Sequence, residues 1–354
     1  MIKKTIINLS LLILLLYVHL AAASPAGEPD AAKESHLQKK FTFLPRPHAT
    51  GTPTRVEVGV YFLDINKIDD VSQTFSADFF LFISWHDQRL AAKNPEEQRI
   101  TREFQPDEIW RPQLEIVNQY DLKKHRKDIY IVDPAGVVRY MQRFTGELSS
   151  PLHLEDFPTD IQSLEINITS IGHGPEDVEL VTDKLRTGQR GSFSLPGWET
   201  EVKPAKVTGE YLASQKRSLA RIDFKISARR HTGFYLVKII FPLVLIVLMA
   251  WTVFWIDPSL AGTQIGISTA SVFSLLLYQS RLTQLLPRIS YLTRLDIFVL
   301  GATLLVFLAL GETILTSRLA KSGKEVLGRR IDTRARWIYL VLFFLIMVYC
   351  FFIL

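Results

Sequence analysis

The run IIFPLVLIVLMAWTVFWI, from Ile239 to Ile256, decides the architecture predicted for this chain of 354 residues. It carries no charged side chain, and a helix that crosses the hydrocarbon core of a bilayer needs about 20 mostly apolar residues. Three more apolar runs follow, a succession that the buried helices of a soluble core would not explain. We therefore predict four membrane-spanning helices, over Ile239–Ile256, Pro258–Ser280, Ile297–Gly311 and Trp337–Leu354.

Charge predicts the orientation of these helices. Seven basic and two acidic residues lie between Arg318 and Arg336, and loops rich in basic residues stay on the cytoplasmic side of a membrane. We therefore expect residues 317–336 to form a short cytoplasmic loop. This location also accounts for much of the net charge of +5 without a nucleic-acid partner.

The N-terminus supports the same orientation. Lys3 and Lys4 precede an apolar run, and three alanines precede Ser24, as in a secretion signal; a membrane anchor is the alternative. We predict a signal peptide over 1–23 and a flexible leader over 24–40. The N-terminal domain and the C-terminus would then lie outside the cytoplasm.

Residues 41–230 have the pattern of an exported β-domain. Polar and apolar residues alternate over Arg55–Phe62 and Arg221–Ser227, whereas Ala77–Trp85 is apolar and aromatic. Turn signals such as Asp133–Gly136 separate these runs. The pattern predicts an all-β, immunoglobulin-like sandwich, followed over 231–354 by the four-helix transmembrane bundle.

Several kinds of site are disfavoured by what the sequence lacks. Cys350 is the single cysteine, so neither a disulfide framework within the chain nor a thiolate metal site can be built. There is no glycine-rich phosphate loop and no Gly-x-Ser-x-Gly nucleophile motif, and the eight histidines lack metal-ligand spacing. We therefore predict no enzyme activity, no cofactor and no metal.

Three motifs, in order along the chain, carry a family resemblance. They are Trp85-His-Asp-Gln-Arg-Leu90, Ile109-Trp-Arg-Pro112 and the loop Ser150-Pro-Leu-His-Leu-Glu-Asp-Phe-Pro-Thr-Asp-Ile-Gln162. The chain resembles the pentameric receptor-channel family, which includes the nicotinic and GABA receptors. The resemblance implies a homopentamer around a central pore in a lipid bilayer, which an agonist opens to inorganic ions.

Departures from the animal receptors point to the prokaryotic branch of this family. Ser150 and Leu164 stand where animal receptors have the cysteines of the signature loop, and Thr159 replaces a phenylalanine. In addition, a short basic stretch precedes the fourth span, where animal receptors have a large cytoplasmic domain.

The second span is the predicted pore helix, because it holds more polar residues than the others and such groups belong against protein or water. Rings of Phe273 and Leu277 would form an apolar gate; the alternative is that both pack between helices. The stretch Ala261–Gln264, at the cytoplasmic mouth, lacks the acid expected of a cation channel and also the arginine expected of an anion channel. Of the two kinds of ion, we expect cations to pass. The resemblance implies that one stripe of the helix faces the axis, at Gly266, Ala270, Phe273, Leu277 and Ser280.

The resemblance also implies an agonist site between subunits, at Phe80, Val117, Ile171 and Tyr211. Only two of these residues are aromatic, so a cage for a quaternary ammonium group is poorly supported. Ordinary core packing is the alternative role for Phe80. The sequence does not identify the agonist: a small amine, a carboxylate, another small molecule and a proton are all open.

Residues at the junction of the two domains are implied to couple agonist binding to opening. Asp160 and Arg230 match a carboxylate–guanidinium pair, which is either shielded from water or an ordinary surface pair. Lys67 belongs to a loop that we expect to press on Pro287 and Tyr291.

Three other functions are weighed against an ion channel. A non-conducting sensor on a membrane anchor would leave the polar second span unexplained. An exported enzyme with a membrane tail would need a catalytic constellation, and a secondary transporter would be expected to show repeat symmetry among its spans. We therefore predict a ligand-gated ion channel.

Overall fold

The computed structural model describes residues 44–47, 51–94, 97, 100–212, 217–285 and 289–353. The predicted signal peptide, 1–23, and the leader, 24–40, lie outside the described residues. Among the described residues, the strands form two sheets. Sheet A contains β1 (Thr54–Asp69), β2 (Thr74–His86), β3 (Arg102–Phe104), β5 (Gln119–Lys124), β6 (Tyr130–Val132), β7 (Val137–Ser149), β9 (Val178–Thr182) and β10 (Gly188–Gln189), and sheet B contains β4 (Leu114–Ile116), β8 (Ile161–Ser170), β11 (Trp198–Leu212) and β12 (Arg217–Arg230).

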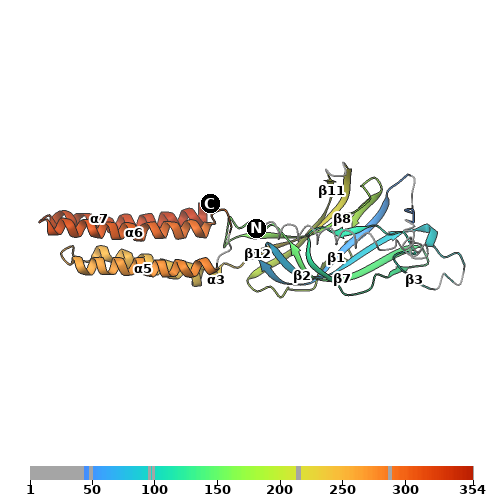
Figure 1. Ribbon diagram of the computed structural model, residues 1–354, viewed down its shortest axis with the longest axis horizontal. Helices are drawn as coiled ribbons and strands as arrows, with labels where there is room; N and C mark the ends of the chain where they lie inside the picture. The colour runs from blue at the N-terminus through green and yellow to red at the C-terminus, as the bar shows by residue number, and fades with distance from the viewer. Residues whose placement is uncertain are drawn as a thin grey trace, which may run out of the picture. The chain divides into compact units, whose positions relative to one another are not determined.

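The strand order confirms the predicted sandwich. Sheet A runs β10-β1-β2-β7-β6-β3, with β5 also paired to β7 and β9 to β1, and sheet B runs β11-β12-β8-β4. Figure 1 shows β1, β2 and β7 side by side, where β2 pairs antiparallel with both neighbours.

The sandwich buries alternate side chains of its strands. On β2, Phe79, Leu81 and Trp85 are buried, whereas Phe80 and Phe82 are only half-buried. Successive side chains of a strand point to opposite faces of the sheet. Phe80 therefore lies on the outer face of sheet A and does not pack in the core.

Aromatic rings fill the centre of the core. Phe79 stacks on Phe144 with ring centroids 5.5 Å apart and meets Phe62 at 6.2 Å. All three rings are buried, and burying an aromatic side chain stabilises a fold by about 2–3 kcal/mol. These contacts join the three neighbouring strands β1, β2 and β7.

The first two motifs of the family resemblance meet in the structure. The rings of Trp85 and Trp110 lie edge to face, 5.8 Å apart. Asp87 accepts a hydrogen bond from the backbone N–H of Arg89 and pairs with its guanidinium at 2.7 Å. Gly136 has a φ of +80°, and a Cβ there would lie 2.6 Å from the Asp87 carbonyl oxygen, so this turn requires glycine.

The described chain also contains four helices long and apolar enough to cross a membrane, as predicted. In Figure 1, α6 and α7 run side by side, in agreement with their contacts. The first span is α3 (Gly233–Tyr235), a π-helical turn (Leu236–Ile240), α4 (Phe241–Thr252) and a 3-10 turn (Val253–Trp255); the others are α5 (Ala261–Leu285), α6 (Arg294–Lys321) and α7 (Glu325–Val348), which a π-helical turn (Tyr349–Ile353) extends.

The π-helical turn of the first span contributes to the packing of α5. Pro242 has no backbone N–H, so a carbonyl one turn earlier loses its helical donor. The hydroxyl of Tyr278, on α5, donates a hydrogen bond to the carbonyl oxygen of Ile239 at 2.6 Å and reaches that of Lys238, four residues before Pro242, at 3.5 Å. The irregular backbone of the first span is therefore satisfied by the neighbouring helix.

The structure corrects the cytoplasmic loop expected over 317–336. Helix α6 continues to Lys321 and α7 begins at Glu325, so most of that stretch is helical. Hydropathy marks only the part of a helix that suits the hydrocarbon core, and the basic residues extend both helices beyond it. A turn of three residues, 322–324, joins them.

Replacing Phe79 with alanine should destabilise the β-domain by about 3–5 kcal/mol, because the cavity left between Phe62 and Phe144 cannot close fully. Leu185→Ala is the matched control, since Leu185 is 98% exposed. Thermal unfolding of the full chain in detergent measures both effects. Equal unfolding temperatures for the two variants would contradict the assignment of Phe79 to the core.

Candidate functional site

Arg230, the last residue of β12, carries a buried guanidinium three residues before the first span begins at Gly233. Its Nε and Nη2 donate to the two carboxylate oxygens of Asp160 at 2.8 and 3.1 Å, and Nη2 also donates to Asp70 at 3.0 Å. The side chains of Arg230 and Asp160 are 5% and 1% exposed. The expected pair is therefore present and buried, and Asp70 is a second partner that the sequence did not indicate.

Aromatic rings enclose the same guanidinium. Its carbon lies 4.1 Å from the ring centroid of Trp198 and 4.9 Å from that of Phe157, and Nη1 donates to the hydroxyl of Tyr235 at 3.2 Å. Burial by itself would lower the pKa of Arg230, but hydrogen bonds to Asp160 and Asp70 outweigh this effect and raise the pKa above its ordinary value. The group therefore stays charged, and the buried charge depends on its carboxylate partners.

Side-chain hydrogen bonds hold the signature loop, which is the third motif of the resemblance (Ser150 to Gln162) and contains Asp160. Gln162 accepts from the N–H of His153, and it donates to the carbonyl oxygen of His153 and to Asp160. Ser150, at the position of the first family cysteine, donates its hydroxyl to the carbonyl oxygen of Ser163 at 3.1 Å. These bonds act where the animal receptors are expected to have a disulfide.

The signature loop also contacts the N-terminal end of α6, which the sequence did not indicate. Asp156 pairs with Arg294 at 2.6 Å, and the N–H of Leu295 donates to the carbonyl oxygen of Phe157 at 3.3 Å. The hydroxyl oxygen of Tyr291 accepts from the N–H of Leu154 at 3.1 Å. Tyr291 therefore lies at the junction, with the signature loop as its partner.

The turn after β1 contributes Asp70 to the buried charge cluster, and Lys67 lies near the end of β1 itself. The ammonium of Lys67 pairs with Asp69 at 2.7 Å. Hydrogen bonds from Lys67 and from the N–H of Ser72 lower the pKa of Asp69 to about 2. Pro287, on which this loop was expected to press, lies outside the described residues.

On α5, the residues expected to line a pore lie on one exposed stripe. Their spacing of four, three, four and three keeps them on one side of a helix. Phe273 and Leu277 are 63% and 74% exposed in the single subunit, and apolar side chains this exposed require an environment that the subunit itself does not supply. The exposed stripe consists of Gly266, Ala270, Phe273, Leu277 and Ser280.

The opposite face of α5 holds polar side chains that bond inside the subunit. Gln264 donates to the carbonyl oxygen of Ile256 at 2.9 Å, and Ser268 shares a hydrogen bond with Thr313 at 3.1 Å. Gln279 donates to a threonine of α6 at 2.6 Å. Much of the polarity that suggested a pore helix is therefore satisfied by neighbouring helices.

The four residues implied in agonist binding are divided between the two sheets. Val117 and Ile171 follow β4 and β8, and Tyr211 lies near the end of β11; all three side chains are exposed. Phe80 lies on the outer face of sheet A, which points away from sheet B. Within one chain, Phe80 therefore lies apart from the other three residues.

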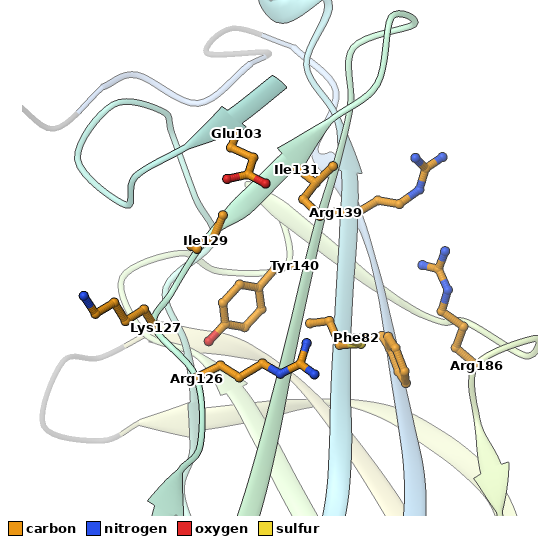
Figure 2. Close-up of a pocket in the computed structure, with 10 residues that line it drawn as sticks. Phe82, Glu103, Arg126, Lys127, Ile129, Ile131, Arg139, Tyr140 and Arg186 are labelled. Atoms are coloured by element: carbon orange, nitrogen blue, oxygen red, sulfur yellow. The ribbon is translucent and has the colours of Figure 1, made fainter. Parts of the chain in front are cut away.

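A pocket of about 570 Å³ opens on the outer face of sheet A (Figure 2). Phe82 of β2 and Met141 of β7, which are cross-strand neighbours, form part of its wall. The ring of Phe82 lies 6.0 Å from that of Phe80, so the pocket adjoins one of the implied agonist residues. Sequence reasoning missed it because strands and loops far apart in the chain supply the lining; its other residues are Glu103, Arg126, Lys127, Ile129, Ile131, Arg139, Tyr140 and Arg186.

Comparison with known proteins gives matches over both domains. The neurotransmitter-gated ion-channel ligand binding domain matches residues 32–232, and the neurotransmitter-gated ion-channel transmembrane region matches residues 239–325. A proton-gated ion channel of Gloeobacter violaceus is 26% identical over 305 residues, which cover 85% of this chain and 83% of the relative. A gamma-aminobutyric acid receptor subunit theta of Mus musculus is 28% identical over 283 residues, which cover 76% of this chain and 43% of the relative.

Removing the guanidinium in Arg230→Gln should lower the stability of the protein by about 3–5 kcal/mol, because Asp160 is left as a buried charge without its main partner. Arg229→Gln is the matched control, since Arg229 is the preceding residue of β12 and is exposed. Thermal unfolding of the detergent-solubilised protein measures the difference. If the two variants unfold at the same temperature, the buried charge cluster does not stabilise the junction.

Proposed function

Because the chain belongs to the neurotransmitter-gated ion-channel family, we propose that five copies form a ligand-gated channel whose pore is lined by α5 and opened by an agonist bound between subunits. The observation that carries this proposal is the exposed stripe of α5. It leaves Phe273 and Leu277 uncovered in a single subunit.

The chemistry of the stripe favours a pore over a lipid-facing surface. Ser280 at one end, and Thr263 one turn before Gly266 at the other, are exposed, and hydroxyl groups are costly against hydrocarbon. In a five-fold ring the same residues would meet water. Phe273 and Leu277 would then form apolar rings between two more polar ends, an arrangement that gates by dewetting.

The division of the agonist residues supports assembly into a ring. Phe80 lies on sheet A, whereas Tyr211 belongs to sheet B of the same chain, so a complete site needs sheet A of one subunit against sheet B of the next. Such a head-to-tail interface closes into a ring when the rotation between subunits allows it. The agonist is a small molecule or a proton; the relative from Gloeobacter violaceus is named for proton gating.

The junction couples the two domains in this proposal. Asp160 and Asp70 hold Arg230, and the signature loop also holds α6 through Arg294. A shift of the β-domain would therefore move the first span and α6 together. The opening step is a change between two arrangements of this junction that tilts α5. Lys67 and Tyr291 lie beside the segments that move in this step.

The proposed channel passes cations across the inner membrane of a bacterium, with the β-domain and the C-terminus outside the cytoplasm. The acidic residue nearest the start of α5 is Asp257. Hydrogen bonds from Ser259 lower the pKa of Asp257, and Arg329, at 2.7 Å, lowers it further. An ionised carboxylate beside the cytoplasmic mouth would attract cations whenever its exposed partner Arg329 turns away from it.

Currents through purified protein in planar bilayers test the channel. Phe273→Ala should change gating, with more current in the absence of agonist, because a smaller side chain widens the apolar ring. Ala320→Gly, near the end of α6, leaves the stripe untouched and is the control. Gating that is unchanged in Phe273→Ala would show that the stripe is not the gate, and pentamers without any current would favour a sensor.

Reversal potentials in a sodium chloride gradient test the charge preference. The native channel should follow the sodium potential, and Asp257→Asn should move the reversal potential toward zero because the mouth loses a negative charge. Glu325→Gln, at the start of α7, serves as the control for loss of a cytoplasmic carboxylate elsewhere. A native reversal potential that follows chloride would overturn the assignment to cations.

A further inference from the structure

Two carboxyl groups face each other between the last two membrane helices. Glu312 of α6 and Asp332 of α7 lie within hydrogen-bonding reach of each other. Asp332 is 1% exposed, and all four carboxyl oxygens of the two residues are buried. Burying an ionised carboxylate is costly unless donors or a cation replace the water that it loses. The pair therefore needs a partner.

The hydrogen-bond donors beside the pair bind other groups. Gln264 and Thr316 lie next to Asp332. Gln264 donates to the carbonyl oxygen of Ile256 at 2.9 Å, and Thr316 donates to the backbone carbonyl oxygen of its own helix at 3.1 Å. Within the described chain, none of the four carboxyl oxygens has a hydrogen-bond partner. The structure therefore contains a buried cluster of acceptors that lacks a donor.

One proton would supply this donor. Ionised carboxylates only accept hydrogen bonds, whereas a protonated carboxyl group donates one. Two carboxylates in contact also repel each other, so such pairs in proteins hold one proton in common. The guanidinium of Arg336, one turn after Asp332 on α7, acts on the pair and is held by a hydrogen bond to the carbonyl oxygen of Phe254 at 2.8 Å. This positive charge balances the single negative charge that remains.

The other helices around the pair add no competing charge among the described residues. The side chain that α5 places beside the pair is the uncharged amide of Gln264. At the end of the first span, Asp257 is paired with Arg329 at 2.7 Å. On α6, Arg318 and Lys321 are exposed. Arg336 is therefore the ion that decides how many protons the pair holds.

The pair lies behind the exposed stripe of α5. Gln264, which touches it, precedes Gly266 by two residues, and residues so spaced lie on opposite sides of a helix. Glu312 is about 27 Å beyond Arg294 along α6, at a rise of 1.5 Å per residue. The pair is therefore at the end of the bundle away from the signature loop, and the proposed orientation puts that end on the cytoplasmic side.

We propose that Glu312 and Asp332 bind a single proton between them, and that this proton, exchanged with the cytoplasm, holds α7 against α6. Binding of the proton needs only one subunit, whereas its effect on opening rests on the proposed channel function. Loss of the proton at high cytoplasmic pH leaves two facing carboxylates that repel each other. Helix α7 then moves away from Gln264, and α5 loses a support behind the stripe.

Infrared spectroscopy of the purified full-length protein in lipid vesicles tests for the proton, because protonated and ionised carboxyl groups have separate stretching bands. The native protein should show a protonated carboxyl band at neutral pH that disappears at high pH. Glu312→Gln and Asp332→Asn should each lose this band at neutral pH, because the new amide donates to the remaining carboxylate.

Glu325→Gln is the matched control for this measurement, since it removes an exposed carboxyl group from α7 and should keep the band. A native spectrum without the band at neutral pH would overturn the proposal. So would a band that is equally strong in the native protein, in Glu312→Gln and in Asp332→Asn.

Thermal unfolding distinguishes a bound proton from a bound metal ion. The native state holds one proton that the unfolded chain releases, so the stability of the native protein should fall as the pH rises. Glu312→Gln has no such proton to release, and its unfolding temperature should fall less over the same pH range. An unfolding temperature that rises with added sodium or calcium in the native protein, but not in Glu312→Gln, would assign the pair to a metal cation and overturn the proposal.

Bilayer currents, with the pH changed on the cytoplasmic side alone, separate this inference from the proposed function. Opening of the native channel should change with that pH, and opening of Glu312→Gln should not; equal responses would contradict the link to opening. The infrared band in a protein that never conducts would support the proton site and contradict the channel. Conduction without the band would support the channel and contradict the proton site.

Discussion

One buried positive charge, the guanidinium of Arg230, constrains the junction between the β-domain and the membrane helices. A carboxylate reaches it from the turn after β1, another from the signature loop, and an indole ring packs on it from β11. Taking a charge out of water costs several kcal/mol unless partners replace the water. Any movement of these segments must keep Arg230 paired, so the junction has a few allowed arrangements rather than a continuous range.

The signature loop transmits this constraint unequally to the helices. Asp160 binds Arg230 in a buried contact, whereas the carboxylate of Asp156, which binds Arg294, is 58% exposed and is screened by water and salt. The loop is therefore fixed more firmly to the strand that enters the first span than to α6. A change at the junction would weaken the exposed Asp156–Arg294 pair before the buried one, while the backbone hydrogen bond from Leu295 to Phe157 still carries the movement to α6.

Local sequence patterns predicted the strands and the membrane spans, but they did not predict the contacts between distant segments of the chain. The uncharged run from Ile239 and the alternation over Arg55–Phe62 are each visible within a few turns or one strand. Asp160 and Arg230 are 70 positions apart, and family resemblance alone suggested their pairing. The sequence did not show that Asp70, and not the neighbouring Asp69, would bind Arg230, because only the folded turn decides which carboxylate faces the guanidinium. The prediction that 317–336 forms a loop was wrong for a related reason, because hydropathy does not show where a helix ends once it has left the hydrocarbon core.

Helix α5 shows why composition alone is a weak guide to a pore wall. Composition counts polar groups without their directions, and the amide of Gln264 and the hydroxyl of Ser268 are already bonded within the subunit. The exposed stripe keeps a hydroxyl at Ser280 and otherwise presents small or apolar side chains. A pore lined by this stripe would hold water weakly, so its width, and not its hydrogen bonding, would decide whether it is wet. Control of conduction would then be a matter of helix tilt, which the junction around Arg230 is placed to set.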